Sequence, residues 1–181
     1  MTTTTASAPA LRRLYLVRFA FALVWAGSLF ATASGIGPVS GALLVLYPLF
    51  DVAAAVVDAR SSRAAGSARG LHLNIAISSL AAVGLAVAVT SGGVPAVLRA
   101  WGIWAVASGA VQLVVGVGRR ELGGQWAMIA SGGLSTLAGT AFFLQASGDG
   151  ATLTTLAGYA LVGGVFFLVS ALRLGRTADE G

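Results

Sequence analysis

Cysteine and lysine are absent from this sequence of 181 residues, and His72 is its one histidine. Without cysteine the chain can form neither a disulfide framework nor a thiolate metal site. One histidine does not supply the ligand set of a zinc site. The sequence also shows no pairing of a nucleophile with a base. These absences predict a protein that is not an enzyme and that binds neither a metal ion nor another cofactor.

Charged residues are scarce as well. They make up 9% of the chain, against about 25% in soluble domains, while hydrophobic residues make up 57%. A soluble domain of this length cannot bury so much apolar surface, whereas a lipid bilayer accepts it. The net charge of +5 comes from 11 arginines that lie mainly at the ends of apolar runs. Nucleic-acid binding needs basic residues gathered on one exposed face, so no nucleic-acid partner is expected.

Six apolar runs follow a polar segment at residues 1–10, which is expected to be a disordered tail. The runs cover about residues 14–33, 39–57, 71–90, 95–118, 125–145 and 151–172. About 20 residues at 1.5 Å each cross a hydrocarbon core of about 30 Å. The runs are continuous rather than alternating, which favours helices over membrane strands. Residues 11–181 are therefore predicted to form a single all-α membrane domain with six transmembrane helices.

The positions of the arginines predict the orientation of this domain. Ten of the eleven lie at the N-terminal segment, at the second-to-third and fourth-to-fifth connections, or at the C-terminus. Arg99, just inside the fourth run, is the exception and is expected to reach the headgroups at the outer surface. By the positive-inside rule, both termini are cytoplasmic in a bacterial inner (plasma) membrane.

An internal repeat relates the three helical pairs. Shifts of 57 and then 55 positions superimpose a glycine, a turn residue and an aromatic residue of each pair. The three sets are Gly27, Pro38 and Tyr47; Gly84, Pro95 and Trp104; and Gly139, Gly150 and Tyr159. The spacing from glycine to aromatic residue is 20 in each set. Three tandem helical hairpins are therefore predicted, with units at about 14–60, 71–118 and 126–173, which stack to bury their faces. A secretory signal peptide at 14–33, suggested by Ala31-Thr32-Ala33, is less consistent with this repeat.

Two segments carry a resemblance to a known family. These are WAVASGAVQLVVGVGRR from Trp104 to Arg120 and WAMIASGGLSTLAG from Trp126 to Gly139. They resemble the short repeat of HdeD-like membrane proteins, which consists of paired helices with a proline between them and glycine-rich second halves that end in basic residues. The resemblance implies an inner-membrane protein of six spans. The named member of that family is associated with acid resistance, and the family supplies no catalytic residues.

Asp51 is the strongest candidate for an intramembrane polar site. It lies seven residues before Asp58, about 10 Å from the cytoplasmic end of its predicted helix. Arg18 is about as far from the Gly35–Pro38 turn as Asp51 is, so the two side chains are expected at similar depth on adjacent antiparallel helices. An ion pair would have a structural role. A carboxylate that faces a cavity would instead respond to protons or cations.

Small residues predict how the helices pack. In the fifth run Ala127, Ser131, Ser135 and Gly139 recur every four residues, a pattern that lets another helix approach closely. Gly109 and Gly164 occupy equivalent positions in the fourth and sixth runs, and the repeat glycines Gly27 and Gly84 are assigned the same packing role. Asn74, Gln112 and Gln145 are expected to be interhelical hydrogen-bond partners.

Two functions remain open from the sequence. One is a non-enzymatic inner-membrane protein of the HdeD-like type that acts in envelope or acid-stress physiology by associating with itself or a membrane-protein partner, surrounded by lipids. The other is a small proton, ion or apolar-solute transporter or channel with Asp51 as its coupling carboxylate. The Gly-Pro interruptions lie at turns, so no mid-span break is expected, which weighs against a transporter. Three repeats could also enclose a central cavity, either packed or open.

Overall fold

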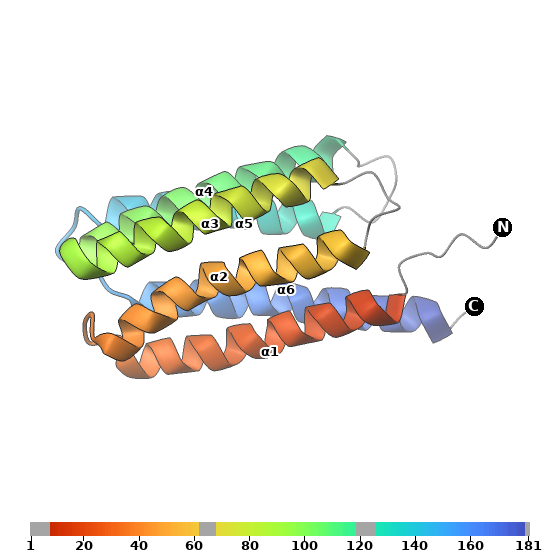
Figure 1. The fold of residues 1–181 in the computed structure, drawn as a ribbon, viewed down its shortest axis with the longest axis horizontal. Coiled ribbons are helices and arrows are strands. Elements are labelled where there is room, and N and C mark those ends of the chain that lie inside the picture. Colours follow the sequence, from red (N-terminus) through yellow and green to blue (C-terminus); the bar gives the residue numbers. More distant parts are fainter. Residues whose placement is uncertain (1–7, 62–67, 119–125, 180–181) are drawn as a thin grey trace.

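A computed structural model describes residues 8–61, 68–118 and 126–179, and all regular structure in these ranges is helical. Six helices run along a common long axis in one bundle (Figure 1). They are α1 (Ala8–Thr32), α2 (Pro38–Ser61), α3 (Ala68–Ser91), α4 (Gly93–Gly118), α5 (Trp126–Gln145) and α6 (Thr154–Asp179). The all-α prediction agrees with this arrangement.

The helix boundaries differ from the predicted runs at two places. Helix α1 begins at Ala8, so the last three residues of the expected tail are helical. Residues 1–7 lie outside the described part of the chain. Helix α6 begins at Thr154 rather than near residue 151, because the Thr152 hydroxyl accepts a hydrogen bond from the Thr154 backbone N–H at 3.3 Å and shapes a turn before the helix.

Short turns reverse the chain at one end of the bundle (Figure 1). Between α1 and α2, the buried Ser40 hydroxyl accepts a hydrogen bond from the Gly37 backbone N–H at 2.8 Å and donates one to the Gly35 carbonyl at 2.9 Å. Pro38 is the first residue of α2, where its fixed φ fits the helix and its missing N–H has no consequence. Between α3 and α4, Gly93 has φ +66°, which lets the second helix begin almost at once.

Most of the helix surface is apolar and points away from the bundle. Helices α1, α2, α3, α4 and α6 are each long and apolar enough to cross a membrane, although only 22–33% of each span is buried inside the protein. Large apolar side chains such as Val24, Leu80, Val114 and Leu137 are 69–75% exposed. Such a surface needs an apolar solvent, and the fold is accordingly that of an all-α membrane protein.

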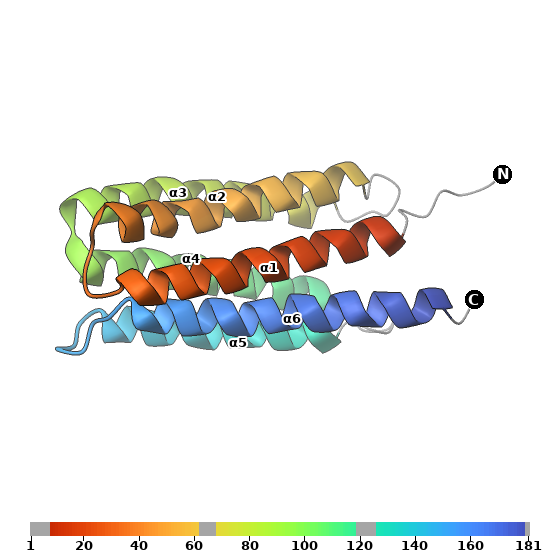
Figure 2. The same ribbon diagram turned by 90° about the horizontal axis from the view of Figure 1, so that it is seen from below.

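The closest helix pairs are not the predicted hairpins. The most extensive contacts join α4 with α5, α1 with α6, and α2 with α3. Of the predicted hairpins, α3–α4 is packed almost as extensively as α2–α3, whereas α1–α2 and α5–α6 are in much less contact. Figure 2 shows α1 running beside α6, although they lie at opposite ends of the sequence. The hairpins are present as antiparallel connections, but each helix packs best against a helix of another pair.

Glycines explain the tight contact between α4 and α5. Gly102, Gly109 and Gly116 recur every seven residues on α4 and face α5, where Gly132 and Gly139 have the same spacing. A Cβ on Gly109 would lie 2.6 Å from the Gly132 carbonyl oxygen, and a Cβ on Gly102 would lie 2.6 Å from the Gly139 carbonyl oxygen. A seven-residue repeat keeps one face of each helix in contact along a slightly wound pair.

This contact corrects the four-residue stripe predicted on α5. Gly139 lies in the contact, but Ser135 is buried toward α6, where its hydroxyl accepts a hydrogen bond from Tyr159 Oη at 2.9 Å. Ser131 is half-buried, and the side chain of Ala127 lies outside the described part. The predicted period of four residues differs from the seven-residue period of this contact, because two antiparallel helices with nearly aligned axes stay in contact along positions spaced by 3.5 residues on average.

The remaining predicted packing glycines behave differently from one another. Gly164 faces α1, since a Cβ there would lie 3.2 Å from the Ala22 Cβ. Gly27 and Gly84 are exposed, and a Cβ on either would meet nothing within 4 Å. Their assignment to close helix packing is therefore wrong within this chain. Gly139, the third glycine of the predicted repeat set, does lie in a helix contact, so the three positions differ in packing.

The α4–α5 contact predicts a specific sensitivity to one methyl group. Gly109→Ala should lower the free energy of unfolding by about 1–3 kcal/mol, because the new Cβ overlaps backbone atoms of α5. Gly84→Ala should leave stability unchanged or raise it by less than about 1 kcal/mol, since alanine favours helix and its Cβ meets nothing. Reversible unfolding in detergent micelles measures both. Equal effects of the two substitutions would contradict the assigned contact.

Candidate functional site: an intramembrane polar network

The structure brings Asp51 and Arg18 together. One guanidinium nitrogen of Arg18 on α1 donates to Asp51 Oδ1 on α2, and the pair is the ion pair expected from their equal distance to the connecting turn. The Arg18 side chain is 16% exposed and the Asp51 side chain is 22% exposed, so both are largely buried inside the protein. A charged pair inside two candidate membrane spans is stable only when its remaining hydrogen-bonding capacity is also satisfied.

Helix α3 satisfies the second carboxylate oxygen. Asn74 Nδ2 donates to Asp51 Oδ2 at 2.8 Å, and Ser78 Oγ donates to the same atom at 2.9 Å. Asn74 and Ser78 are four residues apart, so both side chains project from one face of the helix. Trp104 Nε1 on α4 in turn donates to Ser78 Oγ at 3.1 Å. One carboxylate thus connects four helices, and we call these five residues the Asp51 network.

The sequence pointed to part of this network. Asn74 was expected to be an interhelical partner, and it is one. Gln145 has the same role on α5, since its Oε1 accepts a hydrogen bond from Thr155 Oγ1 at 2.9 Å. Ser78 and Trp104 were not connected with Asp51 beforehand. Ser78 lies four residues after Asn74 on α3, and Trp104 carries an indole N–H on α4, but pairing them with Asp51 required the positions of both helices.

Aromatic side chains surround the network on the α1 and α6 side. The Arg18 guanidinium carbon lies 4.8 Å from the ring centroid of Phe167 on α6, within cation–π range. Phe21 stacks on Phe50 with centroids 3.7 Å apart and an interplanar angle of 8°. Arg18 therefore contacts α2 through its charge and α6 through its planar face.

A proline lies inside α2 next to the network. Pro48 is buried inside the helix, three residues before Asp51, and it has no N–H to donate to the Leu44 carbonyl one turn earlier. The neighbouring carbonyl, that of Leu43, accepts a hydrogen bond from Trp25 Nε1 at 2.7 Å. Helix α2 is nonetheless continuous from Pro38 to Ser61, as expected of a span without a break, and Pro48 removes one backbone hydrogen bond within it.

The centre of the bundle is filled by aromatic rings. Trp25, Tyr47, Trp101 and Trp104 pack together with centroid separations of 4.7–6.0 Å. Trp25 and Trp101 are at most 2% exposed. At this level the centre is packed rather than open. Tyr159, the third repeat aromatic, packs against the same core and edge-on to Phe142.

The other polar candidates lie outside the Asp51 network. His72 near the start of α3 and Arg99 on α4 are both exposed, and Gln112 is half-buried beside Gly132. Within residues 8–61, 68–118 and 126–179 no three acidic or histidine side chains gather as a metal site would require.

Searches of protein-family models, of curated proteins and of solved structures found no match to this chain.

The Asp51 network predicts a measurable coupling between its two charges. Arg18→Ala and Asp51→Ala should each lower the free energy of unfolding by about 2–3 kcal/mol, because each leaves the opposite charge unpaired at membrane depth. The double mutant should lose about 1 kcal/mol less than the sum of the two losses. Arg12→Ala, at an exposed position, is the matched control and should change stability by less than about 0.5 kcal/mol. Strict additivity would show that the pair does not interact.

Proposed function

We propose that this protein is a six-span inner-membrane protein with both termini in the cytoplasm. Five of its described helices have the length and composition of a span, and α5, with 20 residues, runs beside α4. Helix α1 begins and α6 ends at the same end of the bundle, opposite the three short turns (Figure 1). The exposed side chains of Arg12, Arg13 and Arg173 lie toward that end, which supports its assignment to the cytoplasmic side.

The repeat offers a reason for the unexpected helix pairing. In three units of two helices each, the close pairs α2–α3, α4–α5 and α6–α1 all join the second helix of one unit to the first helix of the next. Three equivalent contacts of this kind close a ring about a pseudo-threefold axis. Single units could not bury these faces alone, which is the property of stacked repeats.

Within the membrane we propose a non-enzymatic role that depends on association, either with a second copy or with a membrane-protein partner. The observation that carries this proposal is the satisfied carboxylate of Asp51 beside a filled centre. Each carboxylate oxygen of Asp51 has a donor from the same chain, and aromatic rings occupy the centre. The groups still available for contact are the outward helix faces. Together with the HdeD-like resemblance, this favours a part in envelope or acid-stress physiology.

A second candidate is a small transporter for protons, ions or apolar solutes with Asp51 at its centre. The specific observation in its favour is Pro48, which interrupts the backbone hydrogen bonding of α2 within one turn of a membrane carboxylate that stays 22% exposed. Discontinuous helices form the substrate sites of secondary transporters, and α2, although continuous, lacks one backbone hydrogen bond at this place.

Sidedness predicts which cysteines react from outside the cell. The chain has no cysteine, so single replacements give an unambiguous signal. Ser147→Cys, in the exposed α5–α6 turn, should react with a membrane-impermeant maleimide in intact cells. Arg12→Cys, near the start of α1, should react only after the membrane is opened. The reverse pattern would overturn the orientation, and reaction of both from outside would overturn the six-span topology.

Association predicts crosslinks from outward faces only. Single cysteines in place of Val24, Val83 and Leu137 test α1, α3 and α5, where these side chains are 65–72% exposed. At least one should form a disulfide-linked dimer or a crosslink to a partner in native membranes. Leu85→Cys, a fully buried position on α3, should give none.

Flux measurements separate the two candidate functions. For a protein that acts by association, sealed proteoliposomes should show the same proton and cation leak with wild type, Asp51→Asn and the turn variant Asp149→Asn. Flux in the wild type that disappears only in Asp51→Asn would contradict that role and establish the transporter.

A further inference from the structure

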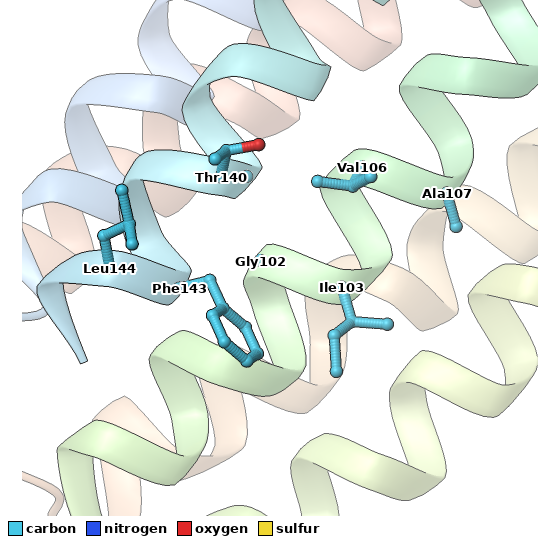
Figure 3. A pocket seen from close by; sticks show the side chains of 8 residues that line it. Gly102, Ile103, Val106, Ala107, Thr140, Phe143 and Leu144 are labelled. Carbon is cyan, nitrogen blue, oxygen red and sulfur yellow. The ribbon is translucent and has the colours of Figure 1, made fainter. Parts of the chain in front are cut away.

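A groove runs along the outer surface between α4 and α5. Its volume is about 410 Å³, which is within the range of small-ligand sites. Gly102 and Gly139 form its closest helix contact, where a Cβ on Gly102 would lie 2.6 Å from the opposing carbonyl. Because these glycines have no side chains, the surface above them is hollowed. Figure 3 shows Val106 of α4 and Thr140 of α5 pointing toward each other across it.

The groove is apolar, but a cation lies next to it. Arg99 is three residues before Gly102 and four before Ile103, so it occupies the same face of α4 one turn closer to the outer end. It lies six residues after Gly93, about 9 Å from the helix start, a distance that its long side chain can span to the headgroup level. Arg99 is exposed and forms no ion pair with the residues that the structure describes.

A second groove provides an internal comparison. It lies between α1 and α6, has a volume of about 310 Å³ and is also apolar. The repeat shifts relate the two grooves, because Gly27 in the second corresponds to Gly139 in the first. The position that corresponds to Arg99 is Thr154, which carries no charge. Of these two equivalent grooves, only the α4–α5 groove has a cation at its outer end.

We propose that the α4–α5 groove binds an acyl chain of an anionic phospholipid whose phosphate pairs with Arg99. The apolar walls fit a lipid tail. The guanidinium fits the phosphate of an anionic lipid whose headgroup has no amine to neutralise that phosphate. This inference rests on the proposed membrane embedding. Asp149, exposed in the turn between α5 and α6 at the same end of the bundle, opposes an anion there.

The binding test uses the full chain in detergent after removal of native lipid. Native mass spectrometry measures its titration with phosphatidylglycerol and with phosphatidylcholine of identical acyl chains. We expect about a fivefold preference for phosphatidylglycerol, the effect of one interfacial arginine on an anionic lipid. Arg99→Gln should abolish the preference, Arg99→Lys should keep most of it, and Asp149→Asn should increase it. Equal binding of the two lipids by the wild type would overturn the proposal, and so would an undiminished preference in Arg99→Gln.

Two further variants test the groove itself. Thr140→Phe fills it at an exposed position and should weaken the binding of both lipids, whereas Ala31→Phe in the second groove should leave the preference unchanged. Thr154→Arg should add a second phosphatidylglycerol. Inorganic phosphate in excess should not displace the lipid, since it lacks a tail. Unweakened binding in Thr140→Phe, or displacement by phosphate, would reject the acyl-chain site.

The competing occupant is a second copy of the chain. A disulfide-linked dimer of Thr140→Cys in native membranes, with phosphatidylglycerol binding lost as the dimer forms, would show that the groove is a protein contact and overturn the proposal. These outcomes are independent of the orientation and flux experiments. The lipid site can fail while the six-span topology and the association role stand, and the reverse also holds.

Discussion

The rest of this structure depends on the burial of one carboxylate at membrane depth. An aspartate in a span is costly unless donors from neighbouring helices surround it. Arg18, Asn74 and Ser78 supply these donors from α1 and α3, and Trp104 extends the hydrogen bonding to α4. Each of these donors meets its acceptor at one relative position of the helices. The network therefore favours one alignment of the four helices along their axes. In lipid, this network orders the helices relative to one another, as apolar burial does in water.

Elsewhere the bundle is held by close approach. Between membrane helices there is little hydrophobic driving force, since lipid tails are as apolar as leucine, and contacts depend on dispersion at short distance. The glycines of α4 and α5 permit backbone contact at a seven-residue period, and Gly164 lets α6 approach α1. Aromatic rings then fill the space on the axis that six helices leave. The Asp51 network thus joins α1, α2, α3 and α4, and glycine contacts join α4 to α5 and α6 to α1.

The surfaces available to other molecules lie on the outside of the bundle. An interior whose carboxylate is satisfied and whose centre is filled has its free surface on the helix faces and in the grooves between them. The two grooves are both apolar but differ by one charge at the outer end, that of Arg99. Pro48 is fully buried in α2 and removes one backbone hydrogen bond beside Asp51. This missing hydrogen bond is the reason that transport is a second candidate function beside association.

The sequence by itself determined the apolar class, the number and approximate bounds of the described helices, and the depth match of Arg18 with Asp51. These depend on run length, rise per residue and position along the chain, which are local quantities. Tertiary structure decided which helices are neighbours, and with that the partners Ser78 and Trp104, the seven-residue glycine contact and the outward position of Gly27 and Gly84. Nearly every face of these helices is apolar, so no polar side marks the outside, and periodicity cannot distinguish a face that meets lipid from one that meets protein.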